Sequence, residues 1–138
     1  QHQPEATLII HTAAAGVEDR RRLREAGVEL VELRAGDDGR VDLGALLDYL
    51  ARREIAALLV EGGPTVHGSF NDAEFVDEVA LFIAPLIIGG PAPAAVAGRG
   101  IASLEAAQRL CFEAIDQHGD DLEIRAVRPE DSDVHGSD

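Results

Sequence analysis

Residues 58–69 read LLVEGGPTVHGS, and this stretch predicts a strand, a tight turn and the start of a helix. The strand is the run IAALLV at residues 55–60, which is uniformly apolar, as is typical of a central strand covered on both faces. Pro64 is well suited to the first position of a helix, which we expect to continue to about Asn71. In open α/β sheets, ligands gather at the carboxyl ends of strands, so this turn is the first candidate site.

The residues of the turn are chemically suited to an anion. Glycine allows positive φ and lets a ligand approach the backbone closely, and free amides at a helix N-terminus attract anions, usually phosphate. Thr65 and Ser69 add hydroxyl groups. An ordinary turn without a ligand is equally compatible, because Gly and Pro also punctuate such turns. The motif is neither the Rossmann pattern nor a Walker loop, since no Gly-Lys-Ser/Thr follows.

Strand-like and helix-like segments alternate on both sides of this turn, which predicts an α/β fold. The clearest helix follows the N-cap residue Asp42, with leucines at positions 43, 46, 47 and 50. Residues 18–26 form a charged helix that Gly27 ends. The other predicted strands are 7–11, 28–33, the second half of 75–83, and a hairpin formed by 109–116 and 122–127. Residues 84–100 are apolar and rich in Gly and Pro, which favours a loop packed on a pocket or an interface.

Composition limits the class of protein. The 138 residues are 46% hydrophobic and 28% charged, typical of one globular domain, and only 4% are aromatic, which predicts an aliphatic core. The net charge of −14 disfavours binding to nucleic acid or anionic lipid. No apolar run reaches the length of a membrane span. The chain begins with Gln1 and contains no Met, so we interpret it as part of a longer protein.

Other candidate sites are weaker. The five histidines include no i, i+4 pair, so we expect no metal site. Cys111, the single cysteine, lies between Leu110 and Phe112, and we expect a buried structural residue rather than a nucleophile. A lone cysteine also suits a reducing cytosol. Residues 129–138 are polar and acidic, which predicts a disordered tail.

The stretches LLVEGGPTVHGSF and FVDEVALFIAPLIIGG together resemble the reductase domain of the bacterial riboflavin biosynthesis protein RibD family. The upstream GRVDLGALLDYLARREIAALLVEGG and the terminal GDDLEIR are similar to it as well, so the likeness runs from about Thr7 to Arg128. The resemblance implies a dihydrofolate-reductase-like fold, a mixed sheet with flanking helices and a C-terminal β-hairpin. It also implies a cytoplasmic homodimer, with residues 84–100 and the hairpin as the expected contact.

The implied activity is the NADPH-dependent reduction of 5-amino-6-(5-phosphoribosylamino)uracil to its ribitylamino product. By this resemblance Glu61 contacts the substrate, and Thr12 faces the adenosine side of the cofactor. The NADPH-contacting stretch comprises Gly63, Pro64, Thr65, Val66, His67, Gly68 and Ser69. No catalytic residue is assigned. A 2′-phosphate favours Arg or Lys, and Arg20, Arg21, Arg22 and Arg24 are available, although a solvated helix face explains these cations better.

Two parts of the family pattern have no counterpart in the sequence. The strands with a Ser-Leu-Asp-Gly-like segment that open the reductase domain are not matched, and one Cys cannot build the zinc site of the deaminase domain often fused upstream. We therefore expect residues 1–128 to be a partial reductase domain. The alternatives are a truncated module kept for dimerisation or nucleotide binding without catalysis, and a reductase of another pteridine-like or pyrimidine-like substrate.

Overall fold

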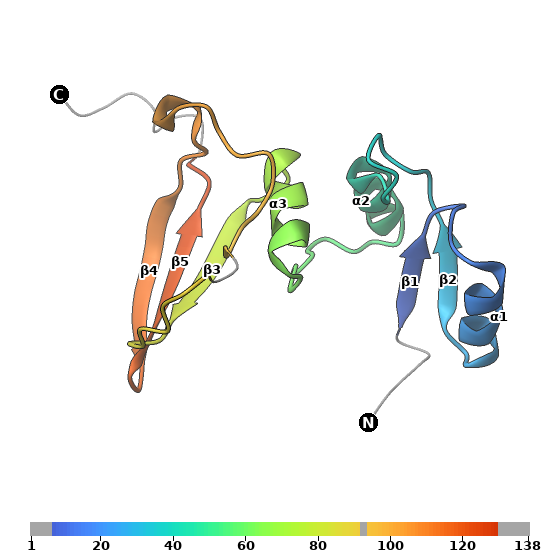
Figure 1. Ribbon diagram of the computed structural model, residues 1–138, viewed down its shortest axis with the longest axis horizontal. Coiled ribbons are helices and arrows are strands. Elements are labelled where there is room, and N and C mark those ends of the chain that lie inside the picture. Colours follow the sequence, from blue (N-terminus) through green and yellow to red (C-terminus); the bar gives the residue numbers. More distant parts are fainter. Residues whose placement is uncertain (1–6, 92–93, 130–138) are drawn as a thin grey trace. The chain divides into compact units, whose positions relative to one another are not determined.

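The computed structural model describes residues 7–91 and 94–129 and divides into two compact units, Gln1–Leu59 and Val60–Asp138 (Figure 1). The first unit contains β1 (Leu8–His11), α1 (Val17–Glu25), β2 (Glu29–Glu32) and α2 (Leu43–Arg52). The second contains α3 (Pro64–Asp72), β3 (Glu78–Ile83), the short 3-10 helix η2 (Leu104–Ala106), β4 (Cys111–His118) and β5 (Asp121–Val127). The predicted alternation of helices and strands is therefore confirmed for these elements, and each unit is described by itself below.

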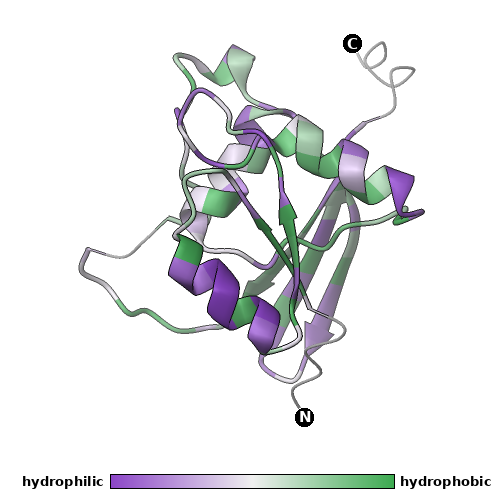
Figure 2. Cartoon of the chain, turned by 90° about the vertical axis from the view of Figure 1, so that its right-hand side faces the viewer, coloured by the Kyte–Doolittle hydropathy of each residue, from purple (hydrophilic) through white to green (hydrophobic). Residues whose placement is uncertain are grey.

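In the first unit, β1 and β2 pair in parallel, with Leu8 opposite Glu29 and His11 opposite Glu32. Parallel neighbours need a crossover, and α1 supplies it. Gly27 has φ +81°, a conformation that suits glycine and lets the chain leave α1 toward β2. Figure 2 shows how hydrophilic α1 is, and the structure buries none of its residues. This helix is therefore a solvated connection, as its charged sequence predicts.

Helix α2 begins at the predicted cap. The side chain of Asp42 accepts a hydrogen bond from the Ala45 backbone N–H at 2.7 Å, and the Arg34 guanidinium donates to the same oxygen at 3.1 Å. At the other end of the leucine series, Leu50 is buried, with 8% of its surface exposed. The amphipathic pattern therefore marks both the start of α2 and its buried face.

The cap makes a testable prediction about pH. The Ala45 N–H bond, followed by the Arg34 bond, lowers the pKa of Asp42 below its ordinary value of 3.8. Because the folded pKa lies below the unfolded one, the carboxylate stabilises the fold above that ordinary value, and the stabilisation is lost as the pH falls through the folded pKa. We expect the melting temperature of Asp42→Asn, which keeps a capping oxygen, to depend less on pH between 3 and 6 than that of the wild type. Melting curves followed by circular dichroism measure this difference, and equal pH dependence in the two proteins would contradict it.

The second unit contains a three-stranded antiparallel sheet in the order β3-β5-β4. Leu81 pairs with Ile124, and Ile124 pairs with Ile115 on its other side. The predicted hairpin is confirmed, since β4 and β5 are joined through Gly119, whose φ is +65°. An irregularity in β4 between Phe112 and Ala114 shifts the register at the start of the hairpin. The fold thus combines a parallel and an antiparallel sheet with helices.

The predicted central strand at residues 55–60 is wrong. These residues are irregular, and Leu59 at 79% and Leu58 at 44% are exposed. A strand needs backbone hydrogen bonds to a neighbouring strand, and residues 56–60 make none to a strand within the described residues. Apolar composition indicates that a segment gains from burial, but it does not specify a pairing partner. Within each unit the described strands form one sheet, parallel in the first and antiparallel in the second.

Two expectations about the core also need correction. Among the described residues, Leu50 is the buried apolar side chain of the first unit, and Phe70 and Ala126 are those of the second. An aromatic ring therefore takes part in the core of the second unit, where only aliphatic residues were predicted. Cys111 is exposed rather than buried. It starts β4, a strand at the edge of its sheet, and an edge strand has a neighbour on one side only. The apolar residues beside Cys111 in the sequence therefore did not predict its burial. The predicted disordered tail, apart from Pro129, lies outside the described residues.

Candidate functional site

The candidate site begins at the turn before α3, where the chain presents free backbone amides. Gly63 is the N-cap, and no side chain caps the helix. The N–H groups of Val66 and His67 donate to the Gly63 carbonyl at 2.9 and 3.2 Å, while Pro64 has no N–H. The Thr65 N–H has no backbone acceptor among the described residues. An amide at the positive end of a helix attracts an anion, so this turn is chemically able to hold one.

The two glycines of the turn differ in their surroundings. A Cβ added to Gly62 would lie 2.5 Å from the Val66 Cβ, so the first turn of α3 itself excludes a side chain there. Among the described residues, a Cβ on Gly63 would meet no atom within 4 Å, and the φ of −75° at this residue suits any amino acid. Gly62 is therefore required by local packing, whereas the space beside Gly63 is open to a ligand.

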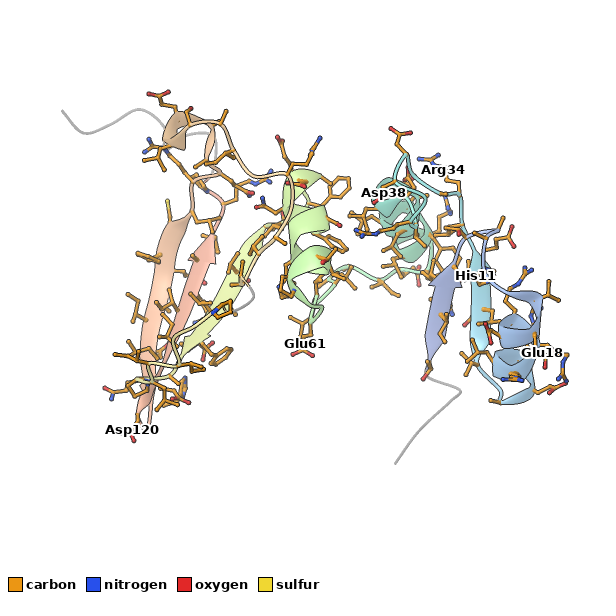
Figure 3. All side chains as sticks on the ribbon, in the orientation of Figure 1. His11, Glu18, Arg34, Asp38, Glu61 and Asp120 are labelled. Atoms are coloured by element: carbon orange, nitrogen blue, oxygen red, sulfur yellow. The ribbon has the colours of Figure 1, made fainter. Side chains whose placement is uncertain are left out.

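Glu61 is exposed and projects from the turn immediately before the helix (Figure 3). Thr65 and Val66 in the first turn of α3 are exposed as well. A carboxylate accepts hydrogen bonds only, so Glu61 suits a ligand with hydroxyl or N–H groups. Together these residues place an acceptor side chain next to a donor backbone.

The remaining predicted residues of the helix have partners within the unit. Gly68 is buried, and a ring nitrogen of His67, Nδ1, lies 3.1 Å from the Ala95 carbonyl. The Ser69 hydroxyl donates to the Thr65 carbonyl at 3.0 Å, so its single proton is used inside the helix. The structure thus brings the predicted residues of this stretch together on one turn and helix. His67, Gly68 and Ser69 contact other residues of the protein, whereas Thr65 and Val66 are exposed.

A segment that the sequence did not single out lies along α3. Residues 95–99, which we call the α3 strap, donate the Ala97 N–H to the Pro64 carbonyl at 3.0 Å. At the other end of the helix, the Arg99 N–H donates to the Asp72 carboxylate at 2.9 Å. The Gly- and Pro-rich composition of residues 84–100 predicted a packed loop, and part of that loop does pack, against the candidate site.

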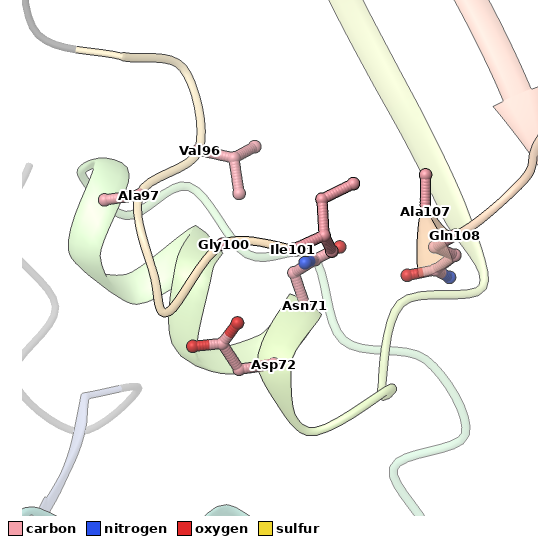
Figure 4. Close-up of a pocket in the computed structure, with 8 residues that line it drawn as sticks. All are labelled: Asn71, Asp72, Val96, Ala97, Gly100, Ile101, Ala107 and Gln108. Carbon is pink, nitrogen blue, oxygen red and sulfur yellow. The ribbon is translucent and has the colours of Figure 1, made fainter. Parts of the chain in front are cut away.

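A pocket of about 320 Å³ lies between the end of α3, the strap and η2 (Figure 4). Its lining is mainly apolar, with two amides and a carboxylate, and comprises Asn71, Asp72, Val96, Ala97, Gly100, Ile101, Ala107 and Gln108. The carboxylate of Asp72 is already bonded to Arg99, and the Gln108 amide donates to the Val76 carbonyl at 3.2 Å. Two of the three polar side chains that line this pocket, Asp72 and Gln108, therefore already have protein partners.

Thr12 belongs to the first unit, where it follows β1 and forms a turn. Its carbonyl accepts from the Ala15 N–H at 3.1 Å, and its hydroxyl lies 3.4 Å from the Ala14 N.

Three of the arginines on α1 already pair with acids of the same unit. Arg21 and Arg22 pair with Glu18, and Arg20 pairs with Glu32. These pairs fit a solvated helix face. Among residues 7–91 and 94–129, no cluster of His, Cys, Asp and Glu fits a metal ion. The helices in the same residues all fall short of the length and hydrophobicity of a membrane span.

The fold is similar to that of solved structures of other proteins. One is Acinetobacter baumannii RibD, with a TM-score of 0.74 and 21% identity over 91% of this chain and 32% of that one. Another is a pyrimidine reductase-like protein from Corynebacterium diphtheriae, with a TM-score of 0.67 and 24% identity over 90% of this chain and 50% of that one. The chain thus has the mixed α/β fold found in these proteins, as the resemblance implied.

The sequence matches the family described as the RibD C-terminal domain over residues 1–123, and the chain belongs to this family. It is 34% identical to the riboflavin biosynthesis protein RibD of Bacillus amyloliquefaciens over 122 residues, 88% of this chain and 32% of that protein. It is 37% identical to the 2,5-diamino-6-ribosylamino-4(3H)-pyrimidinone 5′-phosphate reductase of Aquifex aeolicus over 100 residues, 72% of this chain and 43% of that protein. The chain therefore spans about a third of the RibD relative and under half of the reductase.

Proposed function

We propose that the chain binds NADPH at the turn before α3 and serves the reduction of 5-amino-6-(5-phosphoribosylamino)uracil in riboflavin biosynthesis. The observation that carries the proposal is the exposed helix start, where Gly63 borders open space and the Thr65 N–H lacks a backbone acceptor among the described residues. This start occurs in a member of the RibD C-terminal domain family. Relatives named as pyrimidine reductases support the substrate class.

The residues at the turn fit the groups that such a cofactor and substrate present. The Thr65 amide and the positive end of α3 would hold the pyrophosphate, and Gly63 would let it approach the backbone. Bound NADPH would supply the hydride that reduces the sugar carbon. Glu61 would accept hydrogen bonds from hydroxyl or N–H groups of the substrate. The contribution of this chain is the binding and orientation of two ligands, a major source of rate enhancement in two-substrate reactions.

Calorimetric titration of the full chain with NADPH tests the proposal. We expect saturable binding of NADPH at one site per chain. A second measurement, the loss of NADPH absorbance in the presence of the phosphoribosylaminopyrimidine, separates a reductase from a module that only binds the nucleotide. The absence of any NADPH binding would overturn the proposed function.

We also propose that the chain acts in the cytoplasm as a homodimer. The loop after β3 exposes consecutive apolar residues, with Ile87 at 101% and Ile88 at 91%, and the edge strand β4 exposes Phe112 at 73%. Exposed apolar side chains gathered on one unit favour contact with a second copy of the chain. Sedimentation equilibrium should give twice the chain mass of 14.6 kDa, and Ile87→Asp should shift the protein toward monomer. A wild-type monomer at high concentration would contradict this proposal.

A further inference from the structure

The α3 strap contacts the helix at both of its ends. At the N-terminal end the Ala97 N–H donates to the Pro64 carbonyl, and His67 Nδ1 lies 3.1 Å from the Ala95 carbonyl. At the C-terminal end Arg99 makes two bonds to one residue 27 positions away. Its backbone N–H donates to the Asp72 carboxylate, and its guanidinium donates to the Asp72 carbonyl, each at 2.9 Å.

Two glycines, Gly68 and Gly98, allow the strap to pack closely on α3 in a single arrangement. A Cβ on Gly68 would collide with the Ala97 carbonyl, so the strap backbone lies directly on α3 at this point. Gly98 has φ +126°, and a Cβ there would lie 2.9 Å from both carboxylate oxygens of Asp72. Backbone packed this closely cannot slide along the helix without losing its hydrogen bonds.

The Asp72 carboxylate also has an electrostatic reason to bond the strap. Asp72 is the last residue of α3, where the helix dipole is negative and disfavours a carboxylate. The Arg99 N–H and the guanidinium, whose Nε lies 3.6 Å from the carboxylate, offset this repulsion. In Figure 4 the Asp72 side chain points from the helix toward the strap between Ala97 and Gly100. Asp72 therefore acts as an anchor rather than as a helix-forming residue.

The contact between Ala97 and Pro64 connects the strap to the candidate site through a single peptide unit, the one that joins Pro64 to Thr65. The Pro64 carbonyl and the Thr65 N–H belong to the same planar peptide unit and point in opposite directions. Within α3 the Pro64 carbonyl also accepts the helix hydrogen bond from the Gly68 N–H, so the Ala97 N–H is a second bond to it. This second bond reinforces the direction of the peptide unit and with it that of the Thr65 N–H, the amide offered to the cofactor. We propose that Asp72 and Arg99 are positioning residues for NADPH, which act through the strap without touching the cofactor. This inference rests on the proposed function.

The test compares Asp72→Ala and Arg99→Ala in the full chain with two control variants, Asp37→Ala and Arg109→Ala. Alanine is a good helix former and removes an unfavourable charge from the helix end, so Asp72→Ala does not weaken α3 itself. The controls remove the same chemical groups at exposed positions outside the strap. The readouts are the hydrogen-exchange rate of the Ala97 amide, the melting temperature and the Kd for NADPH.

In Asp72→Ala we expect faster exchange at Ala97 and a Kd for NADPH raised about tenfold, the order of magnitude of losing a preorganised loop. We expect a smaller rise in Arg99→Ala, which keeps the backbone bond, and wild-type values in both controls. Faster exchange with an unchanged Kd would overturn the positioning role and leave the proposed function intact. Unchanged exchange would overturn the anchor itself. A wild-type chain that does not bind NADPH would overturn the proposed function and this inference with it.

Discussion

Gly68→Ala is expected to lower the free energy of unfolding by about 2 kcal/mol, the usual order for overpacking a close contact. The added methyl would run into the Ala97 carbonyl and would lie 2.7 Å from the Gly98 nitrogen. These are backbone atoms, so relief requires movement of the strap and not of one side chain. Alanine by itself favours a helix over glycine by about 1 kcal/mol, so the observed loss is the net of two opposing effects. Equilibrium unfolding in urea of the full chain measures it.

Gly44→Ala in α2 is the matched control for this prediction. It makes the same substitution inside a helix, but the new Cβ would meet only the Asp42 side chain, at 3.3 Å. We expect its free energy of unfolding to change by less than about 1 kcal/mol, because the helix preference of alanine is opposed by a tight contact with the Asp42 carboxylate that caps the helix. A Gly68→Ala protein as stable as Gly44→Ala would show that the strap does not pack on α3 as described.

The elements that the sequence predicted correctly are those with local causes. The leucine spacing specifies the buried face of α2, and Asp42 specifies where the helix begins. Gly27 ends α1 directly after its last turn. The hairpin depends on two strands joined by a short turn at Gly119. In these cases the residues that determine the structure are close together in the sequence, so periodicity and turn chemistry are sufficient to predict it.

The errors concern contacts between distant residues. The run at 55–60 is apolar enough for a strand, but whether it pairs depends on segments far from it in the chain. The exposure of Cys111 depends likewise on the position of β4 at the edge of its sheet. The bond between Asp72 and Arg99 joins residues 27 positions apart and has no local pattern at all. At the candidate site, the turn and the start of α3 at Pro64 could be predicted from the sequence, but the strap that packs on α3 required the structure.

Gly63→Val is expected to weaken NADPH binding about 10- to 100-fold, the order of magnitude of losing a hydrogen bond to a charged group, while the melting temperature stays unchanged. The backbone of Gly63, with φ −75° and ψ 177°, is extended and suits a β-branched residue. Since a Cβ there meets no atom within 4 Å in the described part of the chain, the valine side chain would occupy the space in front of the helix. Its effect should therefore fall on the ligand and not on the fold. Calorimetric titration with NADPH and a thermal melt of the same sample measure the two quantities.

Gly62→Val separates this effect from damage to the turn. A Cβ at Gly62 would lie 2.5 Å from the Val66 Cβ, so this variant must displace the first turn of α3 and should lose both stability and NADPH affinity. Loss of affinity without loss of stability in Gly63→Val, beside loss of both in Gly62→Val, would locate the cofactor in the open space at Gly63. Normal NADPH binding by Gly63→Val would place the cofactor elsewhere on the chain, because no phosphate could then approach the Thr65 amide past the valine.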